Sequence, residues 1–237
     1  MISVTNVEQA FGKKVILQDV NFSMKKGEIV GLLGPSGSGK TTLIKTLIGM
    51  IRSTQGQIEV LGVKQPSLKP MKSIGYMAQS DALYEELTAY ANLAYFGRLY
   101  GLKGKKLKKR IHECLSFVNL DSDIKKPVHK YSGGMKRRLS LAISLIHEPK
   151  LIFLDEPTVG IDPALKHLFW REFERLRQQG ISFLVSTHVM DEAERCNRIL
   201  LVKDGKLFEA GTPKNLIETY GSIDEAFMNV GEEICKF

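Results

Sequence analysis

The sequence has few cysteines and no long apolar run, and both absences limit what the chain can be. Its three cysteines are too few and too scattered for a disulfide framework or a zinc site: Cys114, Cys196 and Cys235. We therefore expect reduced thiols in a cytoplasmic setting. No apolar run approaches the ~20 residues that a membrane-spanning helix needs. The first residues also lack the charged-then-apolar order of a secretion signal, so we expect a chain that does not cross a membrane by itself.

Acidic residues are the minority, because 26 Asp and Glu face 34 Lys and Arg and leave a net charge of +8. Nucleic acid and an anionic membrane surface are the partners that such an excess suggests. Much of the excess lies in residues 103–110, where no aromatic residues are interleaved for stacking on single-stranded nucleic acid. We favour a solvated helix face for this segment, with a surface near lipid headgroups as the alternative. No nucleic-acid partner is expected.

The rest of the composition, 43% hydrophobic and 25% charged over 237 residues, is typical of a globular protein. Short strand patterns and turns fill the chain up to residue 87, including a turn at 11–14. Helical spacing of apolar residues then runs over 88–149, which we call the helical block. Strand character returns at 151–154, followed by a helix over 164–179 that Gly180 closes. The order predicts an α/β core with an inserted helical block.

The most specific motif lies between a predicted buried strand at 28–33 and a helix beginning near Thr42. It matches G-x-x-x-x-G-K-[ST] without a mismatch, and we call it the phosphate loop: Gly34, Pro35, Ser36, Gly37, Ser38, Gly39, Lys40 and Thr41. Backbone N–H groups of such a loop close round phosphate oxygens, aided by the helix N-terminus. Lys40 is then expected to reach the β- and γ-phosphates, and Thr41 to hold Mg²⁺.

A second motif is the apolar run Leu151–Leu154, which ends in the acids Asp155 and Glu156. Ligands of open α/β sheets bind at the carboxyl ends of the strands, so Asp155 is expected near Thr41, where it can help to hold Mg²⁺. Glu156 is expected to act as general base on the water that attacks the γ-phosphate. The alternative is that the two acids form an ordinary turn after a strand. The presence of the phosphate loop in the same chain makes this alternative less favoured.

A third motif, Ser132-Gly133-Gly134, precedes a long apolar helix pattern. Ser132 is a good helix N-cap, and the glycines allow backbone to approach a ligand closely. The segment predicts a second phosphate cradle at a helix N-terminus, although in isolation a plain loop between helices is the better interpretation.

Together these motifs, in this order and over essentially the whole length, resemble the nucleotide-binding subunit of an ATP-binding cassette (ABC) transporter. The resemblance implies a phosphate-loop NTPase (RecA-like) core with an N-terminal antiparallel β-subdomain and an inserted helical subdomain. It predicts one nucleotide-binding domain over 1–237, with the core in 1–87 and 150–237 and the helical subdomain in 88–149. The family's signature loop usually reads Leu-Ser-Gly-Gly-Gln, and here it is residues 131–135, with Tyr131 and Met135 at the changed flanks. Met135 cannot donate a hydrogen bond, which puts a side-chain role of the fifth position in doubt.

Further roles follow from the resemblance alone. Gln79 matches a glutamine that touches Mg²⁺ and the attacking water, and His188 matches a histidine that contacts the γ-phosphate. Asp162 matches an aspartate in a loop that crosses between subunits. Phe11 matches an aromatic that stacks on adenine, with packing under the small sheet as an equal alternative. The family's phosphate motif extends to Thr42.

The implied function is ATP hydrolysis at a head-to-tail dimer interface. Each ATP, with Mg²⁺, would lie between the phosphate loop of one subunit and the signature loop of the other. The expected partners are a second nucleotide-binding subunit and integral-membrane permease subunits, which would hold the chain on the cytoplasmic face of the membrane. Details of residues 131–138 and 160–163 resemble prokaryotic exporters. About 25 residues follow Pro213, which leaves no room for the regulatory domain of many sugar-import subunits.

Three other interpretations remain open at this point. An import subunit is the nearest competitor of an export subunit. A soluble cassette that acts on ribosomes or DNA is the second, although such proteins usually carry two cassettes or a coiled-coil insertion. A small-molecule kinase with the same phosphate loop is the third, against which the Ser-Gly-Gly segment and the paired acids argue.

Overall fold

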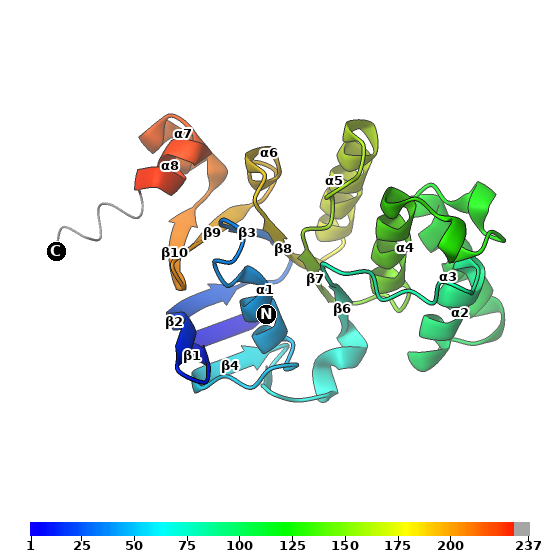
Figure 1. The fold of residues 1–237 in the computed structure, drawn as a ribbon, viewed down its shortest axis with the longest axis horizontal. Helices are drawn as coiled ribbons and strands as arrows, with labels where there is room; N and C mark the ends of the chain where they lie inside the picture. The colour runs from blue at the N-terminus through cyan, green and yellow to red at the C-terminus, as the bar shows by residue number, and fades with distance from the viewer. Residues whose placement is uncertain (230–237) are drawn as a thin grey trace.

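The computed structural model describes residues 1–229, and its framework is two β-sheets with helices between and around them (Figure 1). The larger sheet has six strands in the order β10-β9-β3-β8-β7-β6, and only β10 runs antiparallel to its neighbour. Its strands are β3 (Ile29–Leu33), β6 (Ile74–Met77), β7 (Leu151–Asp155), β8 (Ser182–Thr187), β9 (Arg198–Lys203) and β10 (Lys206–Gly211). Strands β3, β7 and β8 are buried along their whole length, which explains their continuous apolar runs.

The smaller sheet is antiparallel, in the order β2-β1-β4-β5. Its strands are β1 (Ile2–Phe11), β2 (Lys14–Met24), β4 (Gln55–Val60) and β5 (Val63–Lys64). Strands β1 and β2 are much longer than the sequence pattern predicted. Asn6 and Asp19 adopt positive φ where the pairing of β1 with β2 shifts register, and these irregularities interrupt the alternation that marks a strand.

Helix α1 (Lys40–Leu47) lies between the two sheets (Figure 1). Its apolar residues Leu43, Ile44 and Leu47 join one core cluster with buried residues of both sheets. This packing fixes the start of α1 against the end of β3, which is where the phosphate loop must lie.

The helical block lies between β6 and β7 in the chain and projects to one side of the larger sheet (Figure 1). Its helices are α2 (Ala89–Leu99), α3 (Gly104–Phe117) and α4 (Gly133–Leu145), with short 3-10 turns η2 (Asp121–Asp123) and η3 (Val128–Lys130). The apolar face of α3 is buried: Leu107, Ile111, Cys114 and Leu115. A second core cluster joins these helices to α5 (Pro163–Gln178) and the larger sheet. The α/β fold with a small antiparallel sheet and an inserted helical subdomain is confirmed.

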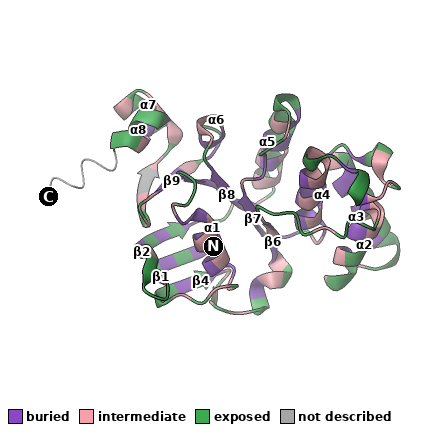
Figure 2. Ribbon diagram, viewed as in Figure 1, coloured by how far each residue is buried: buried purple, intermediate pink, exposed green. Residues whose placement is uncertain are grey.

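The remaining elements are η1 (Lys69–Ser73), α6 (Met190–Ala193), α7 (Pro213–Tyr220) and α8 (Ile223–Asn229). Helices α7 and α8 pack beside the β9–β10 edge of the larger sheet, where they complete a third, smaller cluster. Within residues 1–229, no helix is long and apolar enough to cross a membrane. Cys114 and Cys196 are buried and unpaired, while Cys235 lies outside the described residues. Figure 2 shows the central strands as the most continuously buried part of the fold.

Candidate nucleotide-binding and catalytic site

Four segments of the chain reach the same edge of the larger sheet. Strands β3 and β8 are paired in parallel with Leu33 opposite Thr187, and β7 pairs with β8 so that Asp155 lies opposite Ser186. Strand β6 ends beside them, with Met77 opposite Leu154. The residues that follow these strands are the phosphate loop, Glu156, His188 and Gln79. The topology therefore brings the predicted nucleotide and catalytic residues to one edge, as expected for ligand sites in α/β sheets.

The phosphate loop is tightly packed against its own chain. A Cβ atom on Gly34 would lie 2.3 Å from the Val202 carbonyl oxygen, so only glycine fits there. Gly39 adopts φ +108° immediately before α1, a conformation that side chains disfavour. The Ser38 hydroxyl oxygen is buried without a partner among the described residues. The Ser38 hydroxyl, without a partner in residues 1–229, thus lies beside a helix N-terminus, a place that favours anions.

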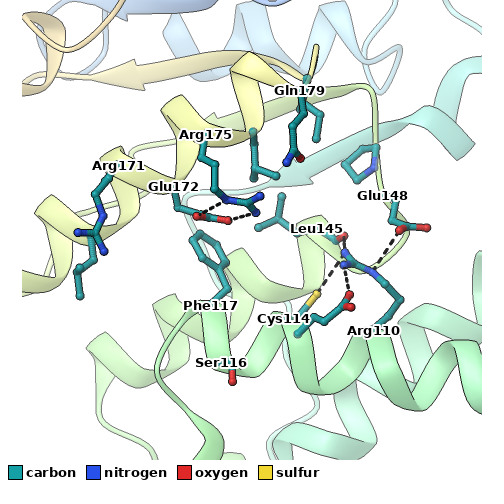
Figure 3. Close-up of a pocket in the computed structure, with 15 residues that line it drawn as sticks. Arg110, Cys114, Ser116, Phe117, Leu145, Glu148, Arg171, Glu172, Arg175 and Gln179 are labelled. Carbon is teal, nitrogen blue, oxygen red and sulfur yellow. Dashed lines mark hydrogen bonds and ion pairs between the residues drawn. The ribbon is translucent and has the colours of Figure 1, made fainter.

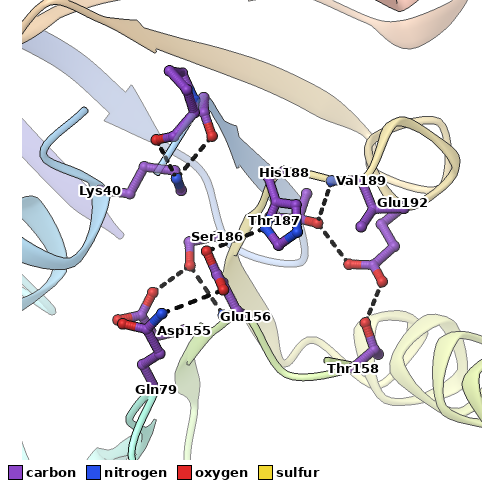
Figure 4. A network of polar contacts seen from close by, with 12 residues as sticks. Lys40, Gln79, Asp155, Glu156, Thr158, Ser186, Thr187, His188, Val189 and Glu192 are labelled. Carbon is purple, nitrogen blue, oxygen red and sulfur yellow. Dashed lines mark hydrogen bonds and ion pairs between the residues drawn. The ribbon is translucent and has the colours of Figure 1, made fainter. Parts of the chain in front are cut away.

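Lys40 is buried inside this loop (Figure 4). Its ammonium donates to the carbonyl oxygens of Gly34 at 2.8 Å and Pro35 at 2.9 Å. Burial lowers the pKa of Lys40, and the nearby charges of Glu156 and Asp155 oppose that shift. The loop thus holds a poorly solvated ammonium group on Lys40, and an incoming phosphate would form an ion pair with it.

Asp155 offers a carboxylate oxygen that the protein leaves without a partner. The residue is buried, its Oδ1 accepts a hydrogen bond from the Ser186 hydroxyl, and its Oδ2 is without a partner among the described residues. Buried polar groups are normally satisfied, so an oxygen left open at this edge is the kind of ligand that Mg²⁺ takes. The Oδ2 oxygen of Asp155 therefore fits a magnesium ion, and Thr41, the second residue of α1, is the other oxygen donor that the sequence predicted for it.

Glu156 meets two of the predicted catalytic side chains (Figure 4). Its carboxylate lies 3.3 Å from His188 Nδ1 and accepts a hydrogen bond from the Gln79 amide at 3.4 Å. The Glu156 backbone has φ +51°, and its N–H donates to the carbonyl and hydroxyl oxygens of Ser186. A non-glycine residue in this region costs about 1–3 kcal/mol and persists when its surroundings fix it. The arrangement brings the three sequence-predicted catalytic side chains, Glu156, Gln79 and His188, into contact.

Arg137 was not among the sequence-predicted residues, yet it contacts the backbone of the segments that carry Gln79 and Glu156. Its buried guanidinium donates to four backbone carbonyl oxygens, those of Ala78, Gln79, Asp155 and Glu156. Burial lowers the pKa of Arg137, while Asp81 at 3.6 Å opposes the shift. The sequence signal was only a basic run at 136–138 after the signature loop.

Ser186 and Glu192 were also missed. The buried Glu192 carboxylate accepts from Thr158 Oγ1 and Thr187 Oγ1 and pairs with Lys166 at 2.7 Å. It thereby ties the segment after Glu156 to the segment that carries His188 (Figure 4). No short motif marks such a hub, because its partners come from three separate elements.

The signature loop lies in the helical block, apart from the phosphate loop in Figure 1. Ser132 caps α4, as predicted, because its hydroxyl oxygen accepts from Met135 N–H at 3.2 Å. Ser132 and Gly133 are exposed, and a Cβ atom on Gly133 would meet nothing within 4 Å. The structure therefore does not bring Ser132–Gly134 together with the phosphate loop of the same chain.

Asp162 and Phe11 occupy local positions that do not test their predicted roles. Asp162 is the N-cap of α5 and accepts from Leu165 N–H at 3.0 Å. The Phe11 ring is 51% exposed, which contradicts the alternative that it packs under the small sheet.

A sequence model described as "ABC transporter" matches residues 17–159 of this chain. The chain belongs to the ABC transporter family. It is 42% identical over 218 residues to the Escherichia coli protein named probable multidrug ABC transporter ATP-binding protein YbhF, covering 91% of this chain but 38% of YbhF. It is 41% identical over 222 residues to Nod factor export ATP-binding protein I of a Rhizobium species, covering 92% of this chain and 73% of that protein.

A solved structure supports the same assignment. The dimeric ATP-binding cassette MJ0796, described in a post-hydrolysis state bound to ADP and Pi, matches with a TM-score of 0.81 and 27% identity. The match covers 88% of this chain and 98% of that one. As a member of this ABC family, the chain is an ATP-binding, ATP-hydrolysing cassette. Membership of the ABC family argues against the small-molecule kinase interpretation.

Proposed function

We propose that this ABC cassette hydrolyses ATP as half of a head-to-tail pair and drives export through separate membrane subunits. The observation that carries the proposal is the separation of two complementary half-sites. The phosphate loop and Glu156 share one edge of the sheet, whereas the exposed Ser132 and Gly133 lie at the start of α4 in the helical block. A second copy or a paralogue would supply the missing half to each nucleotide.

In this proposal different residues of the chain bind the phosphates, hold Mg²⁺ and activate the attacking water. Lys40 and the loop N–H groups bind the β- and γ-phosphates, while Thr41, Asp155 and Gln79 hold Mg²⁺, which would neutralise developing phosphate charge. Glu156 would accept the proton of the attacking water, and His188, 3.3 Å from Glu156, would contact the γ-phosphate. The nucleotide would also be enclosed by the remaining residues of the phosphate loop, by Asp162 and by Ser132–Gly134 of the second subunit. Phe11, whose ring is exposed, would stack on adenine.

ATP would act on the pair through its greater affinity for the closed dimer, and hydrolysis would release that closure. We infer that residues 88–149 move as a unit relative to 1–87 and 150–237 during the cycle. The names of two relatives, one multidrug and one Nod factor export, support outward transport as the work done. Integral-membrane permease subunits would then place the chain on the cytoplasmic face of the membrane.

The experiment that tests the chemistry is Glu156→Gln. The amide cannot take a proton from water, so we expect turnover to fall by ~10²–10⁴ while ATP binding is kept. Single-turnover hydrolysis and equilibrium binding of ATP would separate the two effects. Turnover at the wild-type rate would remove Glu156 from the role of base.

A further inference from the structure

The helical block meets the core along two sides of different character. On one side a cleft of about 800 Å³ separates α3 from α5 (Figure 3). On the α3 side Arg110 pairs with Glu113 at 2.6 Å and with Glu148 at 3.9 Å, and on α5 Arg175 pairs with Glu172. The cleft lies beside a packed contact between the same helices, since the rings of Phe117 on α3 and Phe169 on α5 have centroids 5.5 Å apart.

On the other side Arg137 joins the block to the core. It lies on α4, one turn beyond the Ser132–Gly133 start of that helix. One terminal nitrogen donates to the carbonyl oxygens of Ala78 at 2.7 Å and Gln79 at 3.0 Å. The other donates to the Asp155 carbonyl and to the Glu156 carbonyl at 2.6 Å. A single side chain thus spans the segment after β6 and the catalytic segment after β7.

Only a planar, forked donor can make this pattern. The four terminal N–H groups of a guanidinium point in fixed directions in one plane, so the carbonyl pairs are held at a fixed spacing relative to α4. A lysine ammonium has three donors at one point, and it cannot satisfy four carbonyl oxygens in two segments. Any rotation of α4 must therefore displace the backbone of Gln79 and Glu156, or break these bonds.

We propose that Arg137 is a positioning residue that couples the helix carrying the signature loop to the catalytic backbone of Glu156 and Gln79. When a partner's nucleotide engages Ser132, α4 moves, and Arg137 transmits that movement to the residues that orient the attacking water. The inference rests on the proposed function, because it assigns Arg137 an effect only through Glu156 and Gln79.

The chain offers a matched control in the next residue. Arg138 also donates to two carbonyl oxygens, those of Val118 at 3.2 Å and Asn119 at 3.0 Å, but both lie inside the helical block. Arg138→Lys and Arg137→Lys are the same chemical change on the same helix. Only Arg137→Lys alters the link to the catalytic segment.

The test is steady-state and single-turnover ATP hydrolysis by the full chain, with thermal unfolding of every variant. We expect Arg137→Lys to lower kcat ~10–100-fold, with KM for ATP within about threefold of wild type, because orientation and not binding is lost. Arg138→Lys should keep kcat within about twofold. Arg137→Gln, which leaves no buried charge, serves as a second variant if Arg137→Lys unfolds.

A double-mutant cycle with Glu156→Gln decides whether Arg137 acts through the catalytic acid. In the Glu156→Gln background, Arg137→Lys should cause less than a further threefold loss, because the group it positions is already disabled. Equal losses in both backgrounds, or wild-type kcat in Arg137→Lys, would overturn the inference. If Glu156→Gln itself turns over like wild type, the proposed function fails instead, and the two failures are distinguished.

Discussion

The two glycine-containing loops of this ABC cassette differ in how completely their own chain surrounds them. In the phosphate loop, Gly34 has a carbonyl oxygen 2.3 Å from where its Cβ would be and Lys40 is buried on two carbonyl oxygens, while residues 35–37 are exposed. In the signature loop, Ser132 is exposed and Gly133 has nothing within 4 Å of where its Cβ would be, while a Cβ on Gly134 would lie 3.0 Å from the Gly160 carbonyl oxygen.

This difference separates glycines that fold the chain from glycines that await a ligand. At Gly34 a side chain would strain the folded chain itself. At Gly133 the single chain gives no steric reason for glycine, and the proposed function supplies one, the nucleotide of a partner chain. A phosphate loop packed by its own chain and an exposed signature loop elsewhere on the chain fit a pair of chains in which each nucleotide contacts one loop of each kind.

Removing the cation of the phosphate loop should have the largest effect. In Lys40→Ala the charged hydrogen bonds to phosphate are lost, and we expect ATP affinity to fall by about 10²-fold. Lys45→Ala, in the same helix, is the control and should bind as wild type does. Isothermal titration with ATP and Mg²⁺ measures both, and an unchanged Kd in Lys40→Ala would contradict the phosphate-binding role of the loop.

The comparison between the loops can be tested by one pair of substitutions. Gly34→Ala should lower the free energy of unfolding by about 1–3 kcal/mol, because the Val202 carbonyl belongs to a strand and cannot move away freely. Gly133→Ala should change it by less than about 0.5 kcal/mol. Urea denaturation of the two variants gives these values.

Gly133→Ala should nevertheless weaken ATP-dependent pairing of Glu156→Gln chains, because the added methyl group occupies the space that a partner's nucleotide needs. Light scattering with and without ATP measures the pairing. Equal destabilisation by the two alanines, or undiminished pairing in Gly133→Ala, would break the distinction between the two loops.

The smallest expected effect probes the surroundings of Asp155. Burial and the Asp155 charge raise the pKa of Tyr76 to about 12, and its hydroxyl oxygen is buried without a partner among the described residues. Between pH 10 and 12 the unfolded chain therefore loses this proton before the folded chain does, so stability falls as pH rises. Tyr76→Phe should remove about 1 kcal/mol of that fall at pH 11 in denaturant titrations. If the stability of Tyr76→Phe fell as steeply between pH 10 and 12 as that of the wild type, the buried environment of the Tyr76 hydroxyl would be contradicted.

Sequence reasoning predicted the features that depend on neighbouring residues. The phosphate loop, the acids after β7 and the Ser132 cap are each set by a few consecutive residues whose local geometry is the same in many folds. The order of the elements followed from apolar periodicity. Strands β1 and β2 were underestimated, because positive-φ residues at Asn6 and Asp19 disturb the alternation.

The contacts of Arg137, Ser186 and Glu192 could not be predicted in this way. Each of these residues acts on groups that come from other elements, such as the Ala78 and Glu156 carbonyls for Arg137. Their partners are defined by the packing of the helical block on the sheet, and the sequence contains no spacing that encodes it. The roles of Gln79 and His188 were predicted from family resemblance alone, whereas their contacts with Glu156, at 3.4 and 3.3 Å, come from the fold.

The most direct test of the shared site is chemical trapping between the two loops of different molecules. Chains that carry Ser36→Cys are mixed with chains that carry Ser132→Cys, both with Glu156→Gln and Cys235→Ser, and treated with a short thiol-specific crosslinker. The account predicts a covalent pair of one chain of each kind that forms with ATP and Mg²⁺ and is lost without nucleotide. Crosslinking that never appears with ATP, or that is equally strong without it, would contradict a nucleotide held between the phosphate loop of one chain and the signature loop of the other.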